Sequence, residues 1–291
     1  MTTDLSTTFR ELEENDFRVL NAVERGMQHN EWVPSDEIPG LARLPGDEVE
    51  YRLDRLNDRA LIERKTLQYV GFRLQSGGYD QLALNALVKR GSITEMGSKV
   101  EGGKESEVYK CRSEDSSHVL KLHREGYTDF REVDRERAYS SDKNHVSWLY
   151  TARKAAEKEY EVLEEINDDV SVPFPDDHSR HGVLMRLFDG VELSRADVDE
   201  PSVVLDAVLS EIAAAWVSGY VHADMSEYNV LVSETEVVLI DWPQSVTTDH
   251  PHSRELLERD ISNILSYFER KYPKKENEFR GFEEAVESVV N

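Results

Sequence analysis

The stretch that decides the fold is Gly219-Tyr220-Val221-His222-Ala223-Asp224-Met225-Ser226-Glu227-Tyr228-Asn229-Val230-Leu231-Val232. It places Asp224 and Asn229 in a loop between an expected apolar helix and an expected strand. Twelve residues after Asn229, Asp241 leaves a second apolar strand in Val238-Leu239-Ile240-Asp241-Trp242-Pro243-Gln244. An aspartate after a strand can be a plain turn former. Both motifs together, at this spacing, predict a site for phosphoryl transfer.

The polar residues of this stretch divide into separate tasks. Asp224 is predicted to orient or deprotonate the attacking hydroxyl or water. Asn229 and Asp241 are predicted to bind the magnesium ion that accompanies ATP. His222 is expected to pack the loop.

A phosphate cradle is predicted upstream, where Gly102-Gly103-Lys104-Glu105-Ser106-Glu107-Val108 separates two expected strands. Of the glycines in the pattern Gly-x-Gly-x-x-Gly-x-Val only Gly103 is kept, so an ordinary hairpin turn is the better explanation of this stretch taken alone. We predict ATP contacts from Gly103, Lys104, Ser106 and Val108. Lys104 would add charge, and Ser106 would offer its hydroxyl and backbone amides.

The next apolar strand ends at Lys121, thirteen residues after Val108. Lys121 is predicted to hold the α- and β-phosphates, because a lysine ending an apolar strand needs a partner. Glu159, in the helix expected over residues 150–166, is the predicted partner. Glu157 and a solvated helix face are the alternatives.

Two further segments follow the order of a kinase. The short strand 183–185 places Met185 beside the adenine, with Arg186 and Phe188 offering backbone groups, although any buried strand at this position would look the same. Residues 124–147 are polar and charged, and they predict a long mobile insertion.

Residues 1 to about 90 predict a small helical domain. One helix face is marked by Phe17, Leu20, Val23 and Met27. A second helix is expected after Ser35 as its capping residue, and a third over 47–58. Residues 66–74 alternate as a short β-ribbon that ends at Gly77-Gly78. This order is typical of a winged helix-turn-helix, in which the third helix is the recognition helix.

Three arginines are candidates for nucleic-acid contacts, because Arg52, Arg55 and Arg59 lie on or just after this third helix. They are surrounded by Asp47, Glu48, Glu50, Asp54 and Asp58. A solvated helix face or a protein contact therefore explains the arginines as well as nucleic-acid binding does.

The composition is acidic, with 59 acidic and 35 basic residues and a formal net charge of −24. Such a charge repels nucleic acids and anionic membranes. Dispersed acid with little lysine predicts adaptation to a high-salt cytosol, where charges are screened within about 3 Å; an ordinary acidic mesophilic protein is the alternative. Cys111 is the only cysteine, which fits a reducing cytoplasm. No apolar run is long enough for a membrane helix, and a monomer is expected.

At this point the chain resembles the RIO atypical serine/threonine protein kinases, specifically the subfamily with an N-terminal winged helix. The resemblance covers nearly the whole chain. Its most specific pieces are Gly78-Tyr79-Asp80-Gln81-Leu82-Ala83-Leu84, Gly103-Lys104-Glu105-Ser106, Asp224-x-Ser226-x-Tyr228-Asn229 and Asp241-x-Pro243-Gln244-Ser245. Together with the acidic composition, it predicts an archaeal, halophilic source.

The fold that the resemblance implies is α+β. A winged helix-turn-helix domain is expected over residues 1–90 and a trimmed, two-lobed kinase-like domain over 91–291. The boundary between the lobes is expected near residues 185 and 186.

The activity that the resemblance implies is that of a serine/threonine kinase or an ATPase, with ATP and Mg2+ or Mn2+ as cofactors and a phospho-aspartate at Asp241. The implied partners are the pre-small ribosomal subunit and its rRNA. Asp260 resembles the helix aspartate that braces the catalytic loop. Ala223 stands where glycine is usual, and alanine still fits a tight loop if its φ stays negative. Trp242 stands where phenylalanine is usual and is expected to keep an aromatic plug.

Two other functions stay open. Small-molecule kinases of the aminoglycoside or choline type also use His-x-Asp-x-x-x-x-Asn followed by Ile-Asp-Trp, but the winged helix and Pro243-Gln244-Ser245 argue against them. A nucleotide-gated assembly scaffold without turnover is the third reading. For that reading the four residues Lys121, Asp224, Asn229 and Asp241 still indicate ATP and magnesium binding.

Overall fold

The computed structural model describes residues 4–66, 68–102, 106–114, 116–124, 148–234, 236–273, 275 and 279–290. The chain forms two compact units. The first consists of Met1–Ala156 and Asp177–Leu184, and the second of Glu157–Asp176 and Met185–Asn291. The predicted insertion over 124–147 lies outside the described residues, apart from Arg124.

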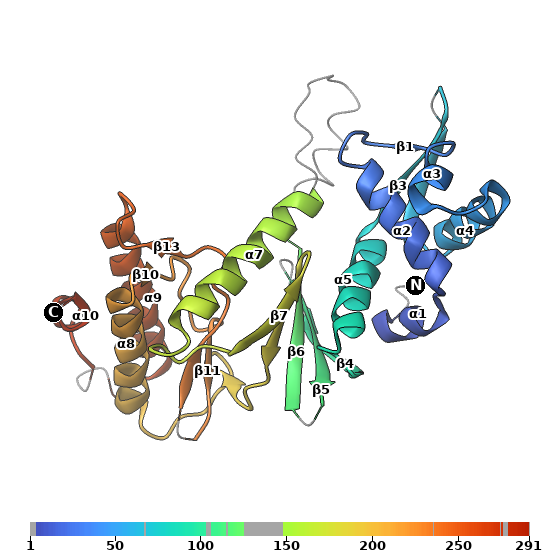
Figure 1. Ribbon diagram of the computed structural model, residues 1–291. Coiled ribbons are helices and arrows are strands. Elements are labelled where there is room, and N and C mark those ends of the chain that lie inside the picture. The colour runs from blue at the N-terminus through green and yellow to red at the C-terminus, as the bar shows by residue number, and fades with distance from the viewer. Residues whose placement is uncertain are drawn as a thin grey trace. The chain divides into compact units, whose positions relative to one another are not determined.

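The first unit begins with the predicted winged helix-turn-helix (Figure 1). Its helices are α1 (Leu5–Glu11), α2 (Glu14–Gly26), α3 (Ile38–Ala42) and α4 (Gly46–Asp58). Its sheet has the order β1-β3-β2, from β1 (Val33–Pro34), β2 (Ile62–Thr66) and β3 (Val70–Leu74). The apolar face predicted for α2 is buried in a core that it shares with α4 and β3. The three predicted helices and the ribbon are therefore confirmed.

Three local predictions in this region are wrong. Glu37, not Ser35, occupies the N-cap position of α3 and makes no capping bond with its side chain, and the N–H of Ser35 donates to the carbonyl of Val70 at 2.9 Å. The ribbon begins at Ile62 rather than at residue 66, because β2 pairs with β3 along its whole length. Gly77-Gly78 does not end the ribbon but lies in the first turn of the next helix.

The rest of the first unit is a sheet against the helix α5 (Ser76–Arg90). The sheet order is β4-β5-β6-β8-β7. Its strands are β4 (Glu95–Gly102), β5 (Ser106–Ser113), β6 (Ser116–His123), β7 (Pro175–Ser179) and β8 (Gly182–Arg186). Ala83, Leu84 and Leu87 of α5 share one buried cluster with Leu120 and Leu122 of β6. The strands predicted on either side of the cradle, the strand of Lys121 and the strand over 183–185 are confirmed, and β7 is an addition.

The second unit contains the decisive stretch. Helix α7 (Trp148–Ile166) begins in the first unit and continues into the second. The other helices are α8 (Pro201–Val217), α9 (Ser253–Lys271) and α10 (Phe282–Val290). The short strands are β9 (Val191–Glu192), β10 (Tyr220–Val221), β11 (Val230–Val232), β12 (Val237–Leu239) and β13 (Val246–Thr247). The predicted helix over 203–218 and the two strands beside the catalytic loop are confirmed.

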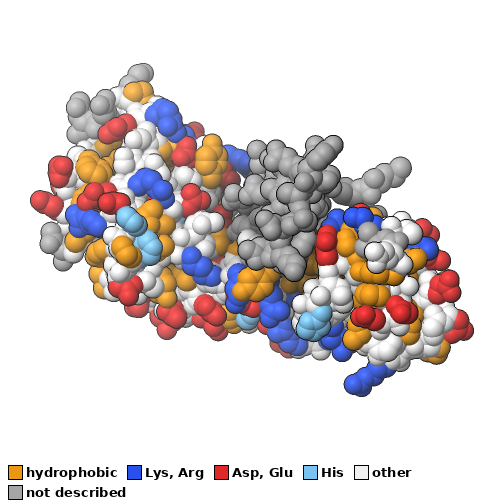
Figure 2. All heavy atoms as spheres, turned by 90° about the horizontal axis from the view of Figure 1, so that it is seen from above, with side chains coloured by type: hydrophobic (Ala, Val, Ile, Leu, Met, Phe, Trp, Pro, Cys, Tyr) orange, Lys and Arg blue, Asp and Glu red, His pale blue; other side chains and the backbone are white. Residues whose placement is uncertain are grey.

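The described surface agrees with the acidic composition. Asp and Glu side chains are spread over the face shown in Figure 2 rather than gathered in one patch. Among the described helices, none combines the length and the apolar character of a membrane span.

Replacing Gly78 by alanine is expected to destabilise the first unit. An added Cβ would lie 2.2 Å from the carbonyl oxygen of Leu61, a backbone atom that cannot rotate away. We expect Gly78→Ala to lower the free energy of unfolding by about 1–3 kcal/mol, measured by denaturant titration.

Gly40→Ala is the matched control, because a Cβ on Gly40 of α3 meets nothing within 4 Å. This change should be neutral or should stabilise the helix by about 1 kcal/mol. Equal effects of the two substitutions would contradict the proposed clash at Gly78.

Candidate active site

The strand pair β11–β12 brings the two halves of the predicted site together. The strands are antiparallel, with Val230 opposite Leu239. Just beyond this pair, the N–H of Ile240 donates to the carbonyl of Asn229 at 3.0 Å. The residue that ends the catalytic loop is therefore a backbone neighbour of the segment that carries Asp241.

The side-chain amide of Asn229 is held within the catalytic loop. Its Nδ2 donates to the carbonyl of Asp224 at 2.8 Å, and the side chain is largely buried. With Nδ2 engaged in the loop, the Oδ1 atom is the side that can face a cation. Amide and carboxylate oxygens are the ligands that Mg2+ prefers, commonly together with substrate phosphates. Asn229 and Asp241 therefore fit the predicted magnesium site.

Asp260 of α9 braces the catalytic loop, as predicted. Its carboxylate accepts the N–H of Ala223 at 2.7 Å and the N–H of Met225 at 3.1 Å. These residues flank Asp224. Burial raises the pKa of Asp260, and the two N–H groups act against that rise. The loop backbone is thus held from the side of α9.

Ala223 does not meet the condition of a negative φ under which alanine is expected to fit the loop. Its φ is 63°, in the left-handed region that favours glycine. The residue is held there from both sides, because its N–H donates to Asp260 and its carbonyl accepts a hydrogen bond from Arg259. The tertiary contacts with α9 therefore outweigh the local preference of alanine.

Asp241 and Trp242 form a tightly fixed turn. Asp241 is also left-handed, with a φ of 73°. Trp242 is fully buried, and its indole Nε1 donates to the carbonyl of Leu239 at 3.1 Å. Its backbone N–H donates to the carboxylate of Glu159 in α7 at 3.1 Å. The predicted aromatic plug is confirmed.

His222 packs this turn against the loop. Its ring centroid lies 4.7 Å from that of Trp242, and its Nε2 lies 2.9 Å from the carbonyl of Ile240. Because a carbonyl can only accept, Nε2 carries the proton. Burial lowers the pKa of His222, which keeps the ring neutral. The structural role predicted for His222 is confirmed.

The predicted phosphate-binding residues lie on adjacent strands of the first unit. Val108 of β5 is directly opposite Lys121 of β6, and Ser106 is opposite His123. Lys121 is buried, with 6% of its surface exposed. Gly103 and Lys104 lie outside the described residues.

Glu159 is almost completely buried, whereas Glu157 is only partly so. Burial favours Glu159 as the residue with a specific role. Because Lys121 and Glu159 belong to different units, their pairing stays a prediction.

The segment predicted to contact adenine begins in the last residues of β8 and continues beyond it. Met185 is buried in that strand. The N–H of Arg186 donates to the carbonyl of Phe174 at 2.9 Å, and its guanidinium lies over the Phe174 ring. The N–H of Arg186 is therefore already used within the protein. The ring of Phe188 lies against Gly190, where an added Cβ would be 2.3 Å from it.

The three arginines predicted to meet nucleic acid point into their own domain. Arg52 is buried, and its guanidinium lies 2.8–3.3 Å from three carboxylates, those of Glu13, Asp16 and Glu48. Arg55 shares two of these carboxylates, and Arg59 lies 3.4 Å from a side chain at the end of α1. These contacts tie α4 to α1 and α2. They give the arginines a role that needs no RNA.

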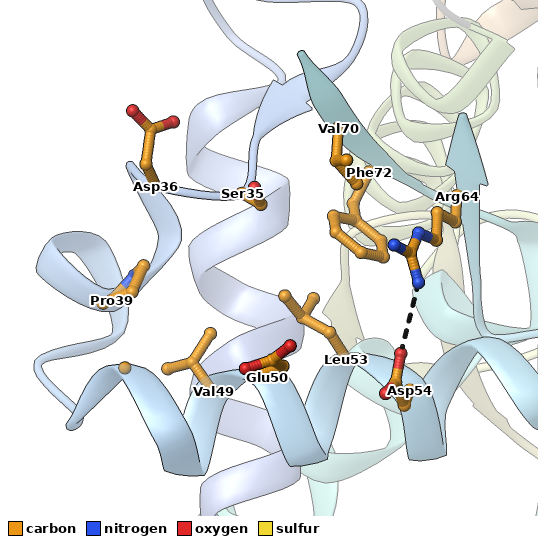
Figure 3. Close-up of a pocket in the computed structure, with 11 residues that line it drawn as sticks. Ser35, Asp36, Pro39, Val49, Glu50, Leu53, Asp54, Arg64, Val70 and Phe72 are labelled. Carbon is orange, nitrogen blue, oxygen red and sulfur yellow. Dashed lines mark ion pairs between the residues drawn. The ribbon is translucent and has the colours of Figure 1, made fainter. Parts of the chain in front are cut away.

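The exposed side of α4 is acidic instead. A hollow of about 330 Å3 lies between α4, the start of α3 and the β3 strand. Figure 3 shows Glu50 and Asp54 on its α4 side and Asp36 on the opposite rim. Arg64 is the basic residue of the lining and lies 3.6 Å from Asp54. This face would repel a phosphate backbone.

The left-handed conformation of Ala223 leads to a test. We expect Ala223→Gly to raise the free energy of unfolding by about 1 kcal/mol, because glycine adopts this φ without the steric cost that alanine bears. Thermal and denaturant unfolding would measure the change.

Ala213→Gly is the matched control, because Ala213 lies within the regular helix α8. There the same substitution should destabilise by about 1 kcal/mol. Destabilisation of similar size at both positions would contradict the account of Ala223.

Comparison with known proteins identifies the family. Residues 9–90 match the Rio2 N-terminal domain and residues 107–280 match the RIO domain. The RIO-type serine/threonine-protein kinase Rio2 of Methanocaldococcus jannaschii is 42% identical over 260 residues, which are 87% of this chain and 95% of the relative. The serine/threonine-protein kinase rio2 of Schizosaccharomyces pombe is 36% identical, over 91% of this chain and 79% of the relative.

A solved structure is similar throughout. The Rio2 kinase–ADP/Mg2+–phosphoaspartate complex from Chaetomium thermophilum superimposes with a TM-score of 0.81 at 30% identity, covering 98% of this chain and 92% of that one. The fold, the two domain matches and the relatives all indicate the same family. This chain belongs to the RIO family of serine/threonine kinases and carries the N-terminal domain of its Rio2 members.

Proposed function

We propose that this protein is an ATP- and magnesium-dependent phosphotransferase whose first phosphoryl acceptor is Asp241. The observation that carries the proposal is the backbone contact between Asn229 and Ile240, which joins the catalytic loop to the segment of Asp241. The orientation of the Asn229 amide adds support. The phosphoaspartate in the complex of the Chaetomium relative agrees with this acceptor.

The roles of the residues follow from their chemistry. Lys121 would bind the α- and β-phosphates, with Ser106, Val108 and the Gly103-Lys104 turn around the nucleotide. Asn229 and Asp241 would hold Mg2+, which neutralises charge on the phosphates.

The first chemical step is a transfer to the chain itself. A carboxylate oxygen of Asp241 attacks the γ-phosphorus of ATP, the bond to the bridging oxygen breaks, and ADP leaves with that electron pair. Water then attacks the phosphorus of the acyl phosphate, and Asp224 orients it and takes its proton. Inorganic phosphate leaves and the carboxylate of Asp241 is restored. A serine or threonine hydroxyl in place of water would give kinase activity.

We further propose that the protein works on the pre-small ribosomal subunit in the cytoplasm of a high-salt cell. Family membership supports the ribosomal partner, and the net charge of −24 supports adaptation to a high-salt cytoplasm. The inward-facing Arg52 and Arg55 give no support for an RNA contact through the recognition helix. Any such contact has to come from other basic residues.

ATP hydrolysis by the purified protein, with magnesium in molar potassium chloride, tests the activity. We expect turnover in the wild type and at least a hundredfold loss in Asp224→Ala and Asp241→Asn. Acid-quenched protein should carry hydroxylamine-labile phosphate that needs Asp241.

Asp249→Asn is the matched control, because it removes the charge of an exposed aspartate eight residues after Asp241. It should keep wild-type turnover. Tight ATP binding without turnover in the wild type would contradict the phosphotransferase and favour the scaffold.

A further inference from the structure

The motif Gly78-Tyr79-Asp80-Gln81-Leu82-Ala83-Leu84 is among the most specific of this sequence, yet none of its residues has a task in the chemistry above. Its charged member is Asp80, in the first half of α5. The two carboxylate oxygens of Asp80 each lie 2.8 Å from a guanidinium nitrogen of Arg124. One of them also lies 2.8 Å from Nε2 of His181. All three side chains are buried.

Arg124 carries this contact into the sheet. It follows β6 directly, and its Nη2 lies 3.3 Å from the carboxylate of Glu107 in β5. Glu107 in turn accepts a hydrogen bond from Tyr109 at 2.9 Å and pairs with Lys99 of β4 at 3.0 Å. A continuous chain of charges therefore runs from α5 across β6 and β5 to β4.

This chain of charges lies on the face of the sheet opposite to the residues predicted to bind ATP. Side chains along a strand alternate between the two faces of a sheet. Glu107 therefore faces the side opposite to that of Ser106 and Val108, and Lys121 shares the face of Val108 because the two residues are directly opposite. Arg124 is only three residues beyond Lys121.

The geometry of the link makes it stiff. Arginine and carboxylate meet in a two-point contact that fixes both position and angle. Burial by itself would raise the pKa of Asp80, but Arg124 and His181 hold that pKa below its ordinary value. The His181 ring is stacked on Tyr79 of the same motif, with ring centroids 4.5 Å apart. The contact between Asp80 and Arg124 is therefore ionised and buried, and the stacked rings of His181 and Tyr79 lie beside it.

We propose that Asp80 is a positioning residue for nucleotide binding, which holds β4 and β5 in register against β6 through Arg124 and Glu107. Through this link α5, which follows the winged helix, helps to fix the strands that carry the predicted ATP-binding residues. The proposal rests on the nucleotide binding proposed above. A contact that only stabilises the fold is the competing explanation.

The Arg180–Glu24 pair provides a matched control. It is another two-point contact of the first unit, with both nitrogen–oxygen distances at 2.7 Å. It joins α2 to the turn between β7 and β8, and the hydrogen bonds described for Arg180 go to α2, to Ser179 and to the carbonyl of Leu82 in α5, not to β4, β5 or β6. Removing it should cost stability without disturbing the strands that carry Ser106, Val108 and Lys121.

The experiment compares Asp80→Asn and Glu107→Gln with Glu24→Gln. Melting temperatures are measured first. The Kd for MgADP is then measured by calorimetry, and KM and kcat for MgATP by hydrolysis, at a temperature at which all variants are folded. Asp80→Asn should raise Kd and KM about tenfold and leave kcat within twofold, because phosphate contacts act alike on bound substrate and transition state.

Glu107→Gln breaks the same chain at a partly exposed residue, so it keeps the test valid if Asp80→Asn fails to fold. It should raise Kd for MgADP at least threefold, and Glu24→Gln should leave it unchanged. Unchanged Kd in Asp80→Asn and Glu107→Gln, or an equal rise in Glu24→Gln, would overturn the proposal. Wild-type binding of MgADP without turnover would overturn the proposed activity alone. Failure of the wild type to bind MgADP would overturn both.

Discussion

The carboxylate of Asp260 is the constraint on which the shape of the catalytic loop depends. It accepts two backbone N–H groups, from Ala223 and Met225, one on each side of Asp224. A buried N–H without an acceptor is costly, so these two bonds define the loop far more strongly than local sequence does. Once the backbone is fixed, the carbonyl of Asp224 is in place to accept from Asn229. The predicted base and the predicted metal ligand are thus set by a residue that takes part in neither task.

Buried charge organises the first unit in the same way. The chain has far more acid than base, yet several of its guanidinium groups are used inside the protein rather than at its surface. Arg52 ties α4 to α2, and Arg124 ties α5 to the sheet of Lys121. Arginine suits this use because its planar fork can bind two carboxylate oxygens at once. Basic residues in a recognition helix are therefore poor indicators of RNA binding when the surrounding chain offers so many carboxylates.

Local patterns predicted most of what is local. Apolar periodicity located the helices and strands, and the motifs placed Asp224 and Asn229 in the loop before one strand and Asp241 at the end of the next. What these patterns did not predict is mostly non-local. The φ of Ala223 depends on Asp260, which is 37 residues away, and the partners of Arg52 include Asp16, which is 36 residues away. Ser35, in the turn after β1, donates its N–H to Val70 of β3, 35 residues away. A single sequence does not reveal which distant group will satisfy a given donor.

The most direct test of the account is to locate the phosphoryl group. Protein incubated with MgATP in high salt would be quenched and reduced with tritiated borohydride, which converts an aspartyl phosphate into homoserine. Peptide mapping by mass spectrometry would then find the labelled position. The account predicts labelled homoserine at position 241, and none in Asp241→Asn. Phosphate found only on serine or threonine, or a label at another aspartate, would contradict the central role of Asp241.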